Sequence, residues 1–160
     1  MKKYFGIILS TILLALSIPV YAEENAEEQY SMVFEEEGSE IDNLFEDEEP
    51  QVTPRSRYIS NIQTQAKYLG SNKVAIHVNV YCNSVVKSIT TIFYLQKYTS
   101  SGWVNVSSGT ISVSNSNTLS KTANVSGVPS GTYRAKSVTK VTDNYGYAEA
   151  LNSYSGAFDI

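Results

Sequence analysis

The sequence predicts an all-β fold, a single antiparallel sandwich of about seven strands, formed by residues 57–160. This part of the chain is rich in Ser, Thr, Val, Tyr and Asn. Its apolar residues alternate with polar ones in short runs, and turn residues separate the runs at intervals of roughly 10 positions. No segment combines a helical period with capping residues, so we expect no helix in this domain.

The first element, residues 1–22, is expected to be a signal peptide. Lys2 and Lys3 precede an apolar run, and Ala22 places a small residue at the expected cleavage position. Acidic residues follow at once, without the basic cluster that stops transfer through a membrane. We therefore expect a secreted or cell-surface-associated protein that keeps no stable membrane anchor after processing.

The second element, residues 23–56, is an acidic arm. It places 13 carboxylates before Pro50 with no Lys or Arg among them, whereas the chain after Pro50 has three carboxylates and 10 basic residues. Like charges repel, and the arm has few apolar residues, so in isolation it should be disordered. It is then either a solubilising linker or a segment that folds against a basic, partly apolar surface, the nearest being its own domain.

The strands of the domain follow from the alternating runs. In the clearest one, residues 74–82, Val74 and its alternate neighbours should face the core, which leaves His77 on the exposed face. Residues 88–98 are apolar on both faces, as expected of a central strand. The expected strands are residues 58–68, 74–82, 88–98, 103–106 with its extension 110–113, 118–125, 132–140 and 147–154.

One segment carries a resemblance to known folds. Pro129-Ser130-Gly131-Thr132-Tyr133-Arg134-Ala135 resembles the entry to the sixth strand of immunoglobulin-like and fibronectin-type-III-like domains. The chain as a whole resembles the small secreted Ig-like proteins of Gram-positive bacteria. This resemblance implies an Ig-like sandwich without the inter-sheet disulfide, and it implies that Tyr133 is a structural tyrosine corner.

The residues offer little support for catalysis. His77 and Cys82 are the only His and Cys, and their odd spacing on one strand puts them on opposite faces. The domain carboxylates, Asp143, Glu149 and Asp159, cannot supply a zinc set or an EF-hand calcium loop. We therefore expect no enzyme, no metal and no cofactor. Nucleic acid is not an expected partner, because no recognition motif accompanies the basic residues.

Two surfaces are candidates for binding. Arg134, Lys136 and Lys140 share one parity of a strand, which predicts either ordinary charged decoration or an anion-binding stripe. The stripe would suit a cell-wall polymer, an acidic glycan or the protein's own arm. The second candidate is a group of aromatic residues at two hairpins, because aromatic rings can stack on sugars. Core packing is the commoner role for a lone Trp. These aromatic residues are Tyr98, Trp103, Tyr145 and Tyr147.

The sequence thus favours a secreted, non-catalytic binding or adhesion module. Its partner would be an anionic cell-surface polymer, a glycan or an extracellular protein. The alternative is an inert extracellular scaffold whose acidic, aromatic arm is the protein-interaction segment.

Overall fold

A computed structural model describes residues 30–36, 40–41, 44–45 and 56–160. The predicted signal peptide lies outside these residues. The described chain is almost entirely β and contains no α-helix, which confirms the predicted fold class, and none of it could cross a membrane as a helix. The strands are β1 (Met32–Phe34), β2 (Ile59–Gly70), β3 (Lys73–Thr99), β4 (Gly102–Ser126), β5 (Thr132–Thr142), β6 (Ala148–Tyr154) and β7 (Phe158–Asp159).

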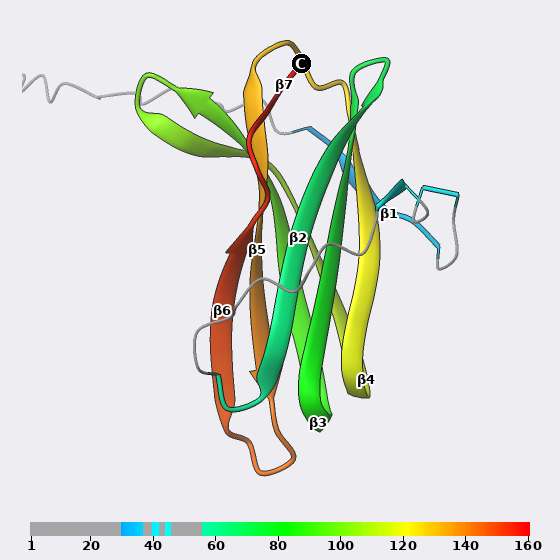
Figure 1. Cartoon of the computed structure of the whole chain (residues 1–160), viewed down its shortest axis with the longest axis vertical. Helices are drawn as coiled ribbons and strands as arrows, with labels where there is room; N and C mark the ends of the chain where they lie inside the picture. The colour runs from blue at the N-terminus through cyan, green and yellow to red at the C-terminus, as the bar shows by residue number, and fades with distance from the viewer. Residues whose placement is uncertain (1–29, 37–39, 42–43, 46–55) are drawn as a thin grey trace, which may run out of the picture.

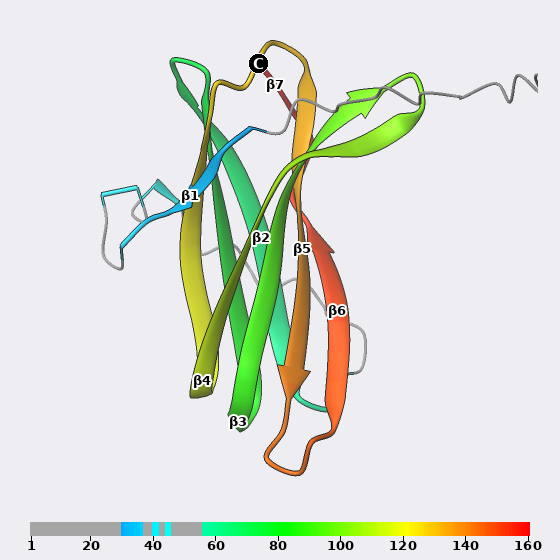
Figure 2. The same ribbon diagram turned by 180° about the vertical axis from the view of Figure 1, so that it is seen from behind.

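Two long strands build both layers of the sandwich. The first half of β3 pairs with β2 and with the second half of β4, whereas its second half pairs with the first half of β4 and with β5. The β3–β4 register is interrupted between Tyr81 and Val86, where the strands pass from one layer to the other. All pairings are antiparallel, and the two opposite views show the layers face to face (Figure 1 and Figure 2).

The sequence analysis separates residues 74–82 from residues 88–98, but the structure joins them in β3. The intervening residues, 83–87, contain neither Gly nor Pro, so the backbone stays extended and bulges instead of turning. β4 likewise joins the predicted segments 103–113 and 118–125.

The core lies between the two layers. Val74, Ile76, Val78 and Val80 of β3 are fully buried, as their parity predicts, and they pack with inward residues of the other layer such as Phe93. The layers also meet through a buried hydrogen bond of 2.7 Å between the hydroxyl groups of Thr64 on β2 and Ser137 on β5. Residues that are distant in the sequence therefore form one continuous core.

Part of the acidic arm packs against this core, whereas the sequence predicts disorder for the isolated arm and leaves open that it folds against its own domain. Met32–Phe34 form β1, which pairs antiparallel with Ala123–Val125 at the edge of β4. The Phe34 ring meets the Phe93 ring edge-on, with centroids 5.1 Å apart. Gly109 of β4 makes room for these arm residues, since a Cβ there would lie 2.9 Å from Met32 Sδ and 3.0 Å from Phe34 Cε2. Alternate apolar residues of the arm thus fill a gap at the sandwich edge.

The arm also reaches the outer face of the first layer. The Phe45 ring stacks on the His77 ring at 5.1 Å. His77 is only 7% exposed and is hydrogen-bonded to Thr122 Oγ1 at 2.7 Å and to Asn79 Oδ1 at 3.1 Å. The prediction of an exposed His77 is therefore wrong, because a distant segment covers the face that its parity assigns to solvent.

Glu149 of β6 closes the opposite edge of the sandwich. Its carboxylate accepts hydrogen bonds from the Ser56 hydroxyl and from the backbone N–H groups of Arg57, Tyr58 and Ile59, where β2 begins. Desolvation acts to raise the pKa of Glu149, but these hydrogen bonds outweigh it and hold the pKa below its ordinary value. One charged side chain thus holds the start of β2 against β6.

Tyr133 has the geometry of a tyrosine corner. Its ring is fully buried, and its hydroxyl donates a hydrogen bond of 2.8 Å to the Pro129 carbonyl oxygen. Replacing Tyr133 with Phe keeps the ring and removes this bond, so we expect a loss of about 1 kcal/mol in the free energy of unfolding. Urea unfolding would measure it, and an unchanged midpoint would show that the hydrogen bond adds nothing to stability.

Candidate functional site

The outer face of the second layer gathers cations, aromatic rings and amides. We call this surface the cation–aromatic face. It is formed by β4, β3, β5 and β6 in that spatial order, so residues from far apart in the sequence lie side by side. Its members are Tyr94, Gln96, Tyr98, Trp103, Asn105, Arg134, Lys136 and Tyr154.

The strand register places these residues together. Gln96 of β3 lies opposite Asn105 on one side and Arg134 on the other. Lys136 lies between Tyr94 and Tyr154 in the same way. Side chains directly opposite one another on one face of a sheet are within contact distance, so the cross-strand rows bring unlike residue types into contact.

Arg134 is the centre of this face. Its guanidinium carbon lies 4.4 Å from the centroid of the Trp103 ring and 4.6 Å from that of the Tyr154 ring. Its Nε donates a hydrogen bond of 2.8 Å to Gln96 Oε1, and Gln96 Nε2 donates one of 2.8 Å to Asn105 Oδ1. Gln96 is only 6% exposed. Among the described residues, the guanidinium is therefore held in place by two rings and an amide, and not by a carboxylate.

The other two cations of the predicted stripe lie on the same face as Arg134. Lys136 Nζ lies 5.7 Å from the Tyr94 ring centroid and 5.9 Å from the Tyr154 ring centroid. Lys140 is exposed farther along β5. Within the described part of the chain, the Lys140 side chain makes no hydrogen bond and no ring contact, so the stripe combines two cations that lie against rings with one that projects into solvent.

The four predicted aromatic residues fall into two separate places. Tyr98 and Trp103 lie opposite each other in the β3–β4 hairpin, with ring centroids 5.2 Å apart. Trp103 is half-buried beneath Arg134 on the outer face, so core packing is the wrong interpretation of this residue. Tyr145 and Tyr147 lie in the β5–β6 connection and are 88% and 64% exposed. Only Tyr98 and Trp103 belong to the cation–aromatic face.

Four members of this face are not predicted from the sequence: Tyr94, Gln96, Asn105 and Tyr154. The parity of residues 94, 96 and 98 carries a signal, because each contributes a polar or aromatic group to one face of β3. That signal identifies the face but not its neighbours. The contacts of Asn105 and Tyr154 depend on the strand register, which the sequence analysis does not determine.

The groups that could support catalysis are engaged in the fold. Burial, with a smaller contribution from Glu149, raises the pKa of the Cys82 thiol to about 11, so it is a poor nucleophile at neutral pH. Desolvation acts to raise the pKa of Asp143, but hydrogen bonds from the Tyr58 hydroxyl and from backbone N–H groups lower it overall. No cluster of metal-binding side chains occurs among residues that the structure describes.

No protein-family model and no curated protein matches the chain. Seven chains of solved structures match it. ACE19, the collagen-binding subdomain of the Enterococcus faecalis surface protein ACE, is similar over 62% of this chain and 96% of its own, with 11% identity and a TM-score of 0.41.

The CARDB domain of the PF1109 protein from Pyrococcus furiosus, solved with di-metal ions, is similar over 68% of this chain and 99% of its own. Its sequence identity is 13% and its TM-score is 0.34. Similarities of this size carry no argument about a ligand. The function has to be argued from the side chains of this chain.

Proposed function

We propose that this protein is a secreted, non-catalytic binding module whose cation–aromatic face recognises an anionic glycan or cell-surface polymer. The observation that carries the proposal is the placement of Arg134 between the rings of Trp103 and Tyr154 on the outer face of the sheet. Decoration that serves only solubility does not need a cation fixed by two rings and an amide network.

The chemistry of the face suits such a ligand in two ways. A guanidinium can donate two parallel hydrogen bonds to a carboxylate, sulfate or phosphate group. The bond shown for Arg134 among the described residues uses Nε, which leaves the Nη groups to meet an anion. Tyr98, 58% exposed, offers a ring face on which a sugar can stack beside the Arg134–Trp103 pair. Because the cations are already positioned, little conformational entropy is lost on binding.

The test is binding to an acidic polysaccharide, such as a uronic-acid polymer, and to its neutral counterpart over a range of salt concentrations. We expect salt-sensitive binding to the acidic polymer alone. Replacing Arg134 with Ala should weaken it about tenfold, and Arg134→Lys, which keeps the charge but loses the planar donor, should fall between. Tyr145→Ala is the control, because Tyr145 lies outside the face and should have no effect.

Equal binding by the wild type and Arg134→Ala would contradict the proposal. The alternative, an inert scaffold with an interacting arm, has less support from the structure. Met32 and Phe34, two of the apolar residues that the arm would present to a partner, already pack against Gly109 and Phe93 of the domain.

A further inference from the structure

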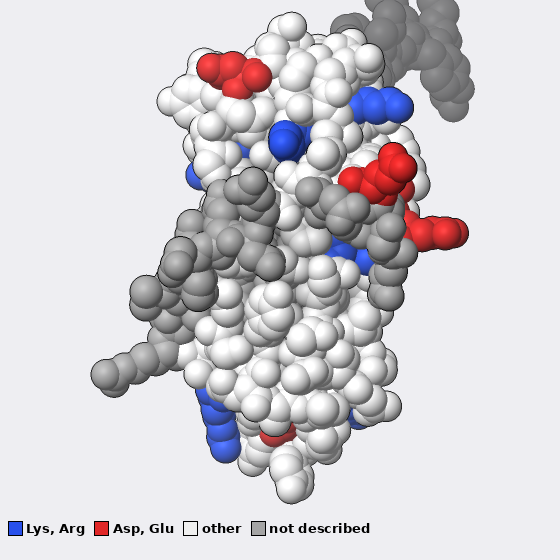
Figure 3. Space-filling view, turned by 45° about the vertical axis from the view of Figure 1, so that its right-hand side comes forward, with Lys and Arg blue, Asp and Glu red and all other residues white. Residues whose placement is uncertain are grey.

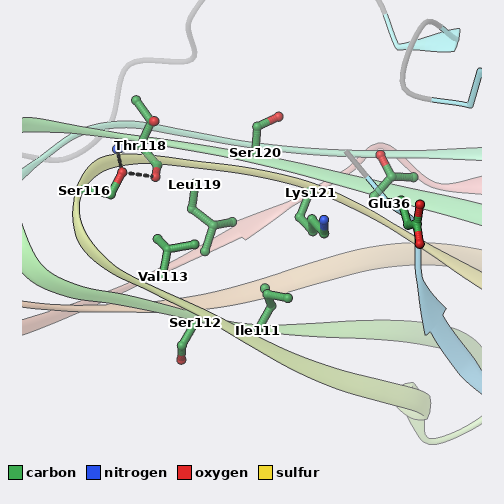
Figure 4. Close-up of a pocket in the computed structure, with 10 residues that line it drawn as sticks. Glu36, Ile111, Ser112, Val113, Ser116, Thr118, Leu119, Ser120 and Lys121 are labelled. Carbon is green, nitrogen blue, oxygen red and sulfur yellow. Dashed lines mark hydrogen bonds between the residues drawn. The ribbon is translucent and has the colours of Figure 1, made fainter. Parts of the chain in front are cut away.

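A groove lies between the two arms of β4, at the edge of the sandwich below β1. Its volume is about 480 Å³. Ile111 and Val113 line it from the first arm and Leu119 and Lys121 from the second, and their side chains point into the space between the arms (Figure 4). On this side of the molecule, charges gather near β1 and a broad uncharged surface lies below them (Figure 3).

The groove lies along the same edge of β4 with which β1 pairs. β1 pairs with the second arm of β4 as far as Ala123, and Glu35 N donates a hydrogen bond of 2.9 Å to the Thr122 carbonyl oxygen. Below this point, Thr118–Lys121 pair with β3 on one side and with no strand on the groove side within the described residues. In the described part of the chain, the edge that holds β1 is therefore open for a further four residues, Thr118–Lys121.

The backbone of Ser120 faces this open edge. Peptide groups alternate in direction along an antiparallel strand, so the N–H and C=O of Ser120 point the same way as those of Thr122, toward the groove. The next residue of this parity, Thr118, is already satisfied, because its N–H and C=O are both hydrogen-bonded to the Ser116 hydroxyl. Ser120 thus offers one donor and one acceptor beside the apolar side chains.

From this arrangement we propose that the groove binds a short extended peptide of another protein as an added β-strand. Its backbone exchanges hydrogen bonds with Ser120, which is how strand addition gives affinity. Residues of one parity face the groove, with an acidic side chain toward Lys121 and apolar side chains toward Leu119 and Val113. Lys121 is the cation among the lining residues, and Glu36 shows that a carboxylate following an added strand reaches the same groove.

The test uses the full chain and two capped peptides, Ac-Asp-Thr-Val-Thr-Val-NH2 and the same peptide with Lys in place of Asp, which place the charged residue next to Lys121 and the first Val next to Leu119 without overlapping β1. We expect the Asp peptide to bind about tenfold more tightly than the Lys peptide and to shift the amide NMR signals of Thr118–Thr122. Absence of binding by both peptides at millimolar concentration would overturn the proposal, as would shifts confined to other strands.

Ser120→Pro is the sharper variant, because it removes the N–H that faces the groove and no ladder bond to β3. It should weaken binding of the Asp peptide about tenfold, whereas Ser120→Ala keeps the N–H and should bind like the wild type. Lys121→Glu should invert the preference between the two peptides, which keeps the proposal testable if the Pro variant does not fold. Equal binding by Ser120→Pro and Ser120→Ala, or an unchanged preference in Lys121→Glu, would refute it.

Discussion

Replacing Phe34 with Ala should lower the free energy of unfolding by about 2 to 3 kcal/mol, although Phe34 belongs to an acidic arm that precedes the domain. The substitution removes the ring that meets Phe93 at 5.1 Å and leaves a cavity above Gly109. A fully buried Phe usually costs about 3 to 5 kcal/mol when it is replaced with Ala. Phe34 is half-buried, so we expect a loss at or just below the lower end of that range. Urea unfolding of the two proteins would measure the difference.

Val33→Ala is the matched control for this prediction. Val33 is the middle residue of β1, and its side chain is 60% exposed on the opposite face. Its substitution leaves the strand pairing intact and should change the free energy of unfolding by less than about 0.5 kcal/mol. If Phe34→Ala and Val33→Ala unfold at the same urea concentration, β1 does not contribute its inward side chain to the core.

The arm also shows what the sequence could and could not predict. Tyr30, Met32 and Phe34 alternate with polar or exposed residues, which is the period of a strand. The surrounding carboxylates favour disorder, and this signal outweighs three apolar positions when the arm is considered alone. The decisive partner is Gly109, about 75 residues later, whose missing side chain opens the space that the arm fills. No local sequence pattern indicates that the arm fits the space at Gly109.

In the domain, features that depend on local alternation were predictable, and features that depend on distant segments were not. The inward parity of Val74 and its alternate neighbours on β3 depends on local alternation alone, and it is correct. The burial of His77 depends on Phe45, and the junction within β3 depends on a bulge that replaces a turn. Properties of one strand follow from its own residues, whereas burial of its second face follows from a segment elsewhere in the chain.

The same distinction between local and distant determinants applies to the cation–aromatic face. The parity of Arg134, Lys136 and Lys140 on β5 is a local property, and all three lie on the outer face. The contacts of Arg134 and Lys136 depend on residues of β3, β4 and β6, which lie on both sides of β5. A row of cations on one strand could be simple decoration. It becomes a candidate binding surface because the register sets Trp103 and Tyr154 against the Arg134 guanidinium.

The second large effect concerns Glu149. Replacing it with Gln should lower the free energy of unfolding at neutral pH by about 2 kcal/mol, a value reduced for partial exposure to solvent. The carboxylate accepts hydrogen bonds from one hydroxyl and three backbone N–H groups, so the neutral amide loses charge-assisted bonds and turns N–H donors toward them. Leu151→Ala is the control. Leu151 lies on the same strand and packs against the core away from these donors, so its substitution removes packing without removing a charge.

The pH dependence distinguishes a charge effect from a packing effect at Glu149. Because the folded-state pKa lies below the ordinary value of 4.5, the stabilisation is fully present above that value and is lost as the pH falls through the folded pKa. The difference in stability between wild type and Glu149→Gln should therefore be constant from pH 7 to about pH 5.5 and shrink below about pH 4.5. The Leu151→Ala difference should keep its size across this range. A Glu149→Gln difference that does not shrink in acid would mean that shape, rather than charge, joins β6 to the start of β2.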